Sequence, residues 1–173
     1  ITKLDEEVKI YKKMLKKSKF HAHIAPHTIE IASMFAILTR LSESNKVNPM
    51  TKLKLYNGEE IVEKGAAKKV DIQELREESQ REGMSGISPR FIMKALDETI
   101  SESEHDCVNP IAILETLVKS VKELAISEDL KKTYLSYLQN VIKKEYHKIL
   151  ENEVTKAFIH GYKEQAEDLF NNY

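Results

Sequence analysis

Apolar residues recur at helical spacing along most of the chain. Near the N-terminus they stand at i, i+4, i+7 and i+11, as Leu4, Val8, Tyr11 and Leu15. This spacing predicts a helix with one buried face. From Pro26 to Leu41 the sequence is apolar on nearly all sides of a helix, so we expect a second, buried helix that begins at Pro26. The pattern predicts an all-α protein with at most a small β excursion.

Three pairs of an Asn or Ser followed by Pro mark further helix starts, namely Asn48-Pro49, Ser88-Pro89 and Asn109-Pro110. The first residue caps the helix, and proline lacks the N–H that would have no acceptor there. The residues expected to face inward are Leu53 and Tyr56 in the first of these helices, Phe91, Ala95, Leu96 and Ile100 in the second, and Ile111, Leu114, Leu117, Val118, Val121 and Leu124 in the third. Asn57-Gly58 is a stop signal.

Two regions leave alternatives open. Residues 59–69 are charged and contain Gly65, which predicts a loop or a small strand pair. Asp71 and Glu74 then have capping-box spacing, so we expect a short helix towards Gln80.

The last segment begins at Ser127, a predicted cap followed by two acids, and carries apolar residues as far as Phe170. One long helix would contain them all. A hairpin with a break near Glu151 or Gly161 would bury more apolar surface.

Composition indicates an ordinary soluble protein. The chain has 173 residues, of which 41% are hydrophobic and 32% charged, and its net charge is −1. No overall field attracts nucleic acid or an anionic membrane, so we expect neither as a partner. No apolar run reaches membrane-spanning length. The chain starts without Met and ends within a predicted helix, and we expect it to be a piece of a longer protein.

His21, His23 and His27 form an H-x-H-x₃-H cluster, which raises the question of zinc. The predicted helix start at Pro26 separates the histidines, and no carboxylate or cysteine completes the set. We therefore expect capping and packing histidines and no metal site.

Cys107 is the only cysteine, which excludes an internal disulfide and fits a reducing cytoplasm. His105 and Asp106 precede it, but neighbours in sequence are not a catalytic dyad. We expect a buried thiol just before a helix.

Arg90 is the most informative position. It stands in the first turn of the helix that Ser88 and Pro89 begin, where the helix dipole disfavours a cation. One reading pairs Arg90 with Asp97 or Glu98. The other has its guanidinium and the free N–H groups of the helix start face one anion, most naturally a phosphate. The chain contains no P-loop and no kinase motif, so it lacks the means to hold Mg-ATP by itself.

Four blocks of the sequence together resemble the PrkA family of bacterial proteins: "HIAPHTIEIASMFAILTRL" (23–41), "KLYNGEE" (54–60), "REGMSGISPRF" (81–91) and "CVNPIAILETL" (107–117). Members are described as serine protein kinases built on an AAA+ ATPase module. The resemblance covers most of the chain, and the combination of blocks is specific.

The resemblance implies a division of the chain. Residues 1–106 would be the helical lid of the AAA+ module, and residues 107–173 would begin the helical C-terminal region. Arg90 would be the sensor-2 arginine that reaches the ATP γ-phosphate, and Ile87 would border the nucleotide. ATP and Mg²⁺ would bind a missing upstream core. The protein would be a cytoplasmic ATP-dependent serine kinase, and this piece alone would be inactive.

A second hypothesis makes residues 109–173 an interaction or homo-oligomerisation module. The ATPase would then serve remodelling or proteolysis, as in other AAA+ machines. The long apolar pattern from Leu130 to Phe170 motivates this alternative.

Overall fold

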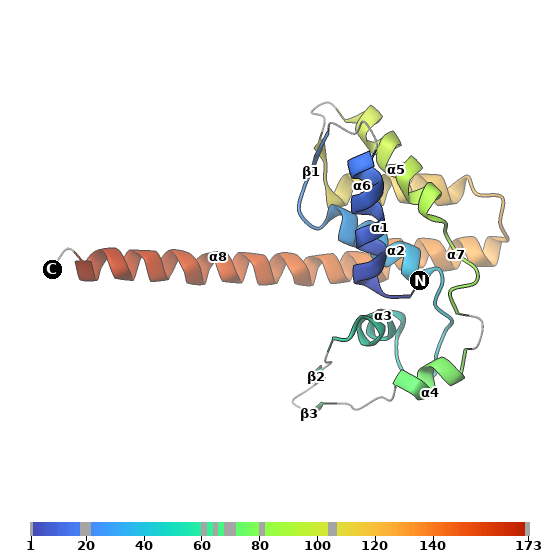
Figure 1. The fold of residues 1–173 in the computed structure, drawn as a ribbon, viewed down its shortest axis with the longest axis horizontal. Helices are drawn as coiled ribbons and strands as arrows, with labels where there is room; N and C mark the ends of the chain where they lie inside the picture. The colour runs from blue at the N-terminus through green and yellow to red at the C-terminus, as the bar shows by residue number, and fades with distance from the viewer. Residues whose placement is uncertain are drawn as a thin grey trace. The chain divides into compact units, whose positions relative to one another are not determined.

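The computed structural model describes residues 2–17, 22–59, 62–63, 66–67, 72–79, 82–103 and 107–171, with backbone only at 62–63, 66–67 and 164–171. The chain divides into two compact units, Ile1–Ile142 and Lys143–Tyr173. Each is described by itself below (Figure 1).

The described residues are mostly helical, as the sequence predicts. The first unit contains α1 (Leu4–Lys17), β1 (His23–Ile24), α2 (Thr28–Leu38), α3 (Pro49–Asn57), β2 (Val62–Glu63), β3 (Ala66–Ala67), α4 (Ile72–Glu77), α5 (Pro89–Glu102), β4 (Cys107–Val108), α6 (Pro110–Lys122), α7 (Glu128–Ser136) and a π-helical turn, η1 (Tyr137–Ile142). The second unit consists of α8 (Lys143–Asn171). The all-α prediction is confirmed.

The second helix, α2, forms the centre of the first unit. It contacts α1, α3, α5, α6 and η1, and every residue from 31 to 38 is buried. The rings of Phe35 and Tyr134 meet edge to face, with centroids 6.0 Å apart. Contact on all sides explains why α2 is apolar around its whole circumference.

The predicted start of α2 at Pro26 is wrong, because the helix begins at Thr28. The N–H of Ala25 donates to the carbonyl of Val108 at 2.8 Å, so the strand-like path of β1 continues to that residue. His27 then turns the chain with a left-handed φ of 64°.

The predicted caps are confirmed. Asn48, Ser88, Asn109 and Ser127 each accept a hydrogen bond from a backbone N–H in the first turn that follows. The stop signal is confirmed as well, since Gly58 takes a left-handed φ of 90° after α3. These features depend on local sequence alone, which is why the sequence predicts them.

The predicted inward faces of α5 and α6 are partly wrong. Ile111 is 58% exposed, whereas Ile92 and Ile113 are fully buried. Between the two helices the Thr99 hydroxyl donates to the Thr116 hydroxyl at 2.9 Å. The neighbouring helices decide which side of each helix faces the core. The apolar residues of α5 and α6 span a wider arc of the helix than the part that is buried, so the sequence pattern does not specify which of them face inward.

Two short strand pairs complete the first unit. β2 and β3 pair antiparallel, as one of the two alternatives for residues 59–69 predicts. β1 and β4 pair parallel, with His23 opposite Cys107 and Ile24 opposite Val108. The second pair is not predicted, because its strands are far apart in sequence. The short helix α4 forms as expected, while Asp71, Gly65 and Gln80 lie outside the described residues.

At the C-terminus the long helix forms and the hairpin does not. Glu151 and Gly161 both lie inside α8. No proline interrupts the segment, and a single glycine costs a helix only about 1 kcal/mol. None of the described helices is both long and apolar enough to cross a bilayer.

Candidate functional site

Residues 82–88 form the loop before α5 and lead directly into the predicted anion site. Gly83 and Gly86 have positive φ, at 81° and 109°. A Cβ on Gly86 would stand 2.6 Å from the Thr39 carbonyl oxygen. Glycine therefore lets this loop lie against the end of α2.

Arg40 binds the loop from the end of α2. Its Nε and Nη2 both donate to the carbonyl oxygen of Ile87, at 3.2 and 2.8 Å. The Ile87 N–H donates to the Thr39 hydroxyl at 3.0 Å, and the Gly83 N–H donates to the Arg40 carbonyl at 3.1 Å. Both peptide groups of Ile87 are thus fixed just before Ser88, the cap of α5.

Glu7 holds Arg40 from the other side. The guanidinium donates to both carboxylate oxygens of Glu7, Nη1 to Oε2 and Nη2 to Oε1, each at 2.8 Å. The Tyr11 hydroxyl also donates to Glu7. Glu7 and Tyr11 are fully buried and Arg40 is 9% exposed. We call Glu7, Tyr11, Thr39 and Arg40 the Arg40 cluster.

The ionic states of the Arg40 cluster follow from these contacts. Burial raises the pKa of Glu7, but the hydrogen bonds from Arg40 and Tyr11 and the charge of Arg40 lower it more, so the pKa falls below its usual 4.5. Burial lowers the pKa of Arg40, and the hydrogen bonds and charge of Glu7 outweigh that effect and raise it. Burial, and then Glu7, raise the pKa of Tyr11. The cluster therefore holds a buried carboxylate, a guanidinium and a neutral phenol.

A second buried ion pair holds the start of the same loop. Glu82 pairs with the ammonium of Lys52, which is 1% exposed. Glu82 also accepts hydrogen bonds from the Tyr56 hydroxyl at 2.7 Å and from the Ser42 N–H at 2.9 Å. The loop is therefore anchored at both ends, and Met84 between them is 85% exposed.

Arg90 lies in the first turn of α5, where the sequence places it. Its side chain is exposed. Within the described part of the chain it makes no hydrogen bond or ion pair, and Glu98 pairs instead with Lys119 at 3.1 Å. The apolar side chain of Ile87 is 7% exposed, and its backbone makes the polar contacts with Thr39 and Arg40. That Arg90 and Ile87 bind a nucleotide stays a prediction.

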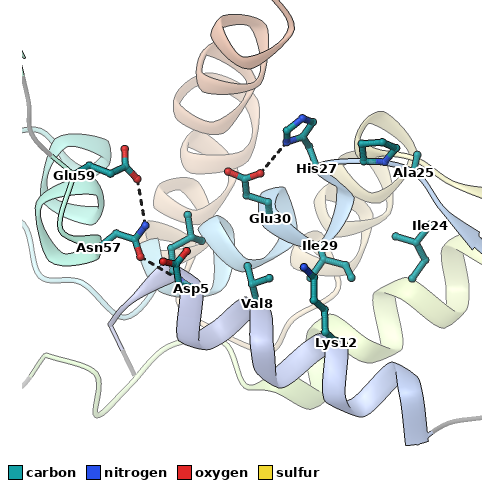
Figure 2. A pocket seen from close by; sticks show the side chains of 12 residues that line it. Asp5, Val8, Lys12, Ile24, Ala25, His27, Ile29, Glu30, Asn57 and Glu59 are labelled. Carbon is teal, nitrogen blue, oxygen red and sulfur yellow. Dashed lines mark hydrogen bonds and ion pairs between the residues drawn. The ribbon is translucent and has the colours of Figure 1, made fainter. Parts of the chain in front are cut away.

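A cleft of about 550 Å³ lies among α1, the turn before α2 and the end of α3. Figure 2 shows Asp5, Glu30 and Glu59 around it, with Lys12 at one side. A phosphate there would meet three carboxylates and one ammonium. The cleft is therefore a poorer anion site than the start of α5.

The histidines of the predicted cluster do not come together as a described site. His27 is at the cap position of α2, and its Nδ1 lies 2.8 Å from a Glu30 carboxylate oxygen. His23 is exposed on β1, and His21 lies outside the described residues. Among the described side chains no group of three metal-ligating residues occurs.

Cys107 is half-buried rather than buried as predicted. It occupies β4, directly before α6, and lines a second cleft of about 300 Å³. A two-residue edge strand covers only one side of a side chain, which explains the partial exposure. His105 and Asp106 lie outside the described residues.

Sequence reasoning missed the buried ionic residues. Glu7 comes three residues after Leu4 and four before Tyr11, which puts it on the apolar face of α1. Arg40 adjoins the apolar run of α2, and Lys52 precedes Leu53. The available signal was a charge at a position that shares a helix face or a run with apolar residues. Such a charge is rarely buried without a partner, but the sequence does not say which partner it meets.

The chain belongs to the PrkA family. The sequence model of the PrkA AAA domain matches residues 1–48, and that of the PrkA serine protein kinase C-terminal domain matches residues 50–173. The Arg40 cluster lies in the first range, and the loop that it binds lies in the second. The recognition made from the four sequence blocks is confirmed.

Two curated relatives align with 99% of the chain. One, at 36% identity, is named ATP-dependent protease PrkA, from Bacillus subtilis (strain 168). The other, at 29% identity, is named serine/threonine kinase YeaG, from Escherichia coli (strain K12). The chain spans 27% of the length of each. No solved structure matches the chain.

Proposed function

We propose that this chain is the lid and adjoining helical region of an ATP-dependent PrkA-family enzyme, in which Arg90 contacts the γ-phosphate of ATP. The carrying observation is an exposed arginine, without an ionic partner among the described residues, in the first turn of α5. The upstream part of the full-length protein would supply the P-loop and Mg²⁺ site in the cytoplasm.

The electrostatics of the helix start support this role. In the free protein, the positive end of the α5 dipole repels the guanidinium of Arg90. A phosphate placed between the helix N-terminus and the guanidinium would be attracted by each of them. Ser88 accepts the Phe91 N–H at 3.4 Å, and the Arg90 N–H has no acceptor among the described residues. A guanidinium and a backbone N–H are therefore available to one anion. Charge that develops on a transferred phosphoryl group would be stabilised there.

Replacing Arg90 by alanine in the full-length protein tests the proposal. We expect the kcat for ATP hydrolysis to fall about tenfold or more, because about 1.4 kcal/mol of transition-state stabilisation is a factor of ten. The matched control is Lys94→Ala, which removes an exposed cation one turn further along α5. Steady-state hydrolysis and ATP affinity are measured for both variants, with thermal unfolding as the check on folding. Unchanged affinity and turnover in Arg90→Ala would make Arg90 structural.

The proposal also concerns the reaction that ATP drives in the full-length protein. We favour serine kinase activity on the family description. Proteolysis or remodelling is the alternative, because one relative is named a protease. Transfer of labelled γ-phosphate to a protein substrate by the full-length protein separates the two, since protease activity yields free phosphate and peptides instead.

The second candidate function is self-association through α8. Four apolar residues at i, i+4, i+8 and i+12 are exposed, namely Leu150 at 38%, Val154 at 56%, Phe158 at 64% and Tyr162 at 70%. Exposed apolar rows of this kind are typical of interaction surfaces. In this reading ATP would control assembly of the helices.

A further inference from the structure

The carbonyl of Ile87 is a polar contact between the end of α2 and the residue directly before the cap of α5. It precedes the Ser88 cap by one residue and Arg90 by three. Arg40 donates two hydrogen bonds to it, and Thr39 accepts the N–H of the same residue. A shift of the Arg40 guanidinium would therefore move the start of α5.

Arg40 is in turn fixed by a bidentate ion pair with Glu7. A planar guanidinium that meets both carboxylate oxygens has one orientation, because two parallel N–H···O bonds fix its plane. The pair is buried, so solvent does not loosen it. Glu7 on α1 thus sets the direction in which Arg40 presents Nε and Nη2 to Ile87.

We propose that Arg40, held by Glu7, is a positioning residue for Arg90. The Arg40 cluster would fix the first turn of α5 so that Arg90 meets the γ-phosphate. This inference rests on the proposed function of Arg90. The Arg40–Ile87 contact also joins the segment matched by the AAA-domain model to the segment matched by the C-terminal model.

Lysine cannot replace Arg40 in this role. An ammonium is a single point charge, and it cannot make the bidentate pair with Glu7 while sending two N–H groups to the Ile87 carbonyl. Arg40→Lys therefore keeps the buried charge and removes the geometry. It is the variant that separates positioning from charge.

The test is a double-mutant cycle in the full-length protein, with kcat for ATP hydrolysis as the readout. Wild type, Arg40→Lys, Arg90→Ala and the double variant are compared. If Arg40 acts through Arg90, Arg40→Lys lowers kcat about tenfold when Arg90 is present, since a misplacement of about 1 Å costs up to about a hundredfold. In the Arg90→Ala background it should lower kcat by less than about twofold.

Controls separate positioning from loss of fold. Ile113→Val trims a fully buried residue of α6 that makes none of the polar contacts of the Arg40 cluster, and it should leave kcat per folded molecule unchanged. If Arg40→Lys does not fold, Thr39→Val takes its place in the same cycle, because it removes the acceptor of the Ile87 N–H together with one hydrogen bond at the end of α2, from the Thr39 hydroxyl to the Ala36 carbonyl, and leaves Arg40 and Glu7 in place.

The outcomes are distinct. Equal losses from Arg40→Lys with and without Arg90 would overturn the positioning role and leave the proposed function intact. The same holds if Arg90→Ala lowers kcat and Arg40→Lys does not. No effect of Arg90→Ala alone would overturn both.

Discussion

At the residue scale, the main finding is a carboxylate inside an apolar helix face. The stripe of α1 predicts Val8 as an inward residue, yet Glu7 is fully buried and Val8 lines the cleft. Burial of a lone carboxylate would cost several kcal/mol. The guanidinium of Arg40 and the hydroxyl of Tyr11 offset this cost through direct hydrogen bonds. Glu7 is therefore ionised in the folded chain.

The ionised state of Glu7 predicts how stability depends on pH. Its pKa in the folded chain is below the ordinary 4.5, so the folded chain binds fewer protons there than the unfolded chain. The contribution is present above pH 4.5 and is lost as pH falls through the lowered folded-state pKa. In Glu7→Gln we expect a loss of about 3–5 kcal/mol at neutral pH, because Arg40 is left without its counter-charge.

Urea unfolding of residues 1–173 between neutral pH and acid measures this effect. The difference between wild type and Glu7→Gln should shrink as pH falls below 4.5. Glu123→Gln, at an exposed acid, is the control and should unfold as wild type does. A difference that stays constant with pH would show that Glu7 is not the titrating group.

At the element scale, two glycines with positive φ serve different purposes. Gly58 ends α3, and a Cβ there would meet nothing within 4 Å. Gly86 lies against the end of α2, and a Cβ there would collide with the Thr39 backbone. The first position needs only a left-handed residue, and the second also needs the absence of a side chain.

Alanine substitutions separate these two requirements. Gly58→Ala should lower the free energy of unfolding by about 1 kcal/mol, the cost of a left-handed alanine. Gly86→Ala should cost about 3 kcal/mol or more, because backbone strain and overlap with a carbonyl add. Urea unfolding of the two variants of residues 1–173 gives the comparison. Equal losses would mean that the 82–88 loop does not lie against α2 in solution.

At the scale of the whole molecule, the divisions of the chain fall in different places. The two family models meet between residues 48 and 50, whereas the compact units meet between Ile142 and Lys143. The division at residues 106 and 107 stays a prediction. Because Arg40 binds Ile87 across the boundary of the family models, residues on both sides belong to one folded unit.

The exposed apolar row of α8 predicts self-association. Light scattering of residues 1–173 over a range of concentrations should show a mass that rises with concentration. Phe158→Glu places a charge in the centre of the row and should shift the mass towards the monomer. Asn152→Glu, an exposed position on the opposite side of α8, is the matched control and should behave as wild type. A monomer at every concentration would exclude self-association through this helix.

The sequence by itself determined the helical class, four helix caps, the stop at Gly58 and the family. Each of these depends on a few neighbouring residues or on a whole-chain pattern, so no partner in space is needed. Ser88 and Pro89 begin α5 because of their own backbone and side-chain chemistry, and Arg90 follows them.

Only the tertiary structure decided which faces are buried and where the buried charges meet. An amphipathic helix can rotate by about 100° for each residue of offset, and its neighbours choose among these rotations, as Ile92 and Ile113 show. The contact of Arg40 with Glu7 and Ile87 joins three distant segments. A sequence pattern shows that a charge lies in an apolar run, but the partner that makes its burial favourable is fixed by how the helices pack.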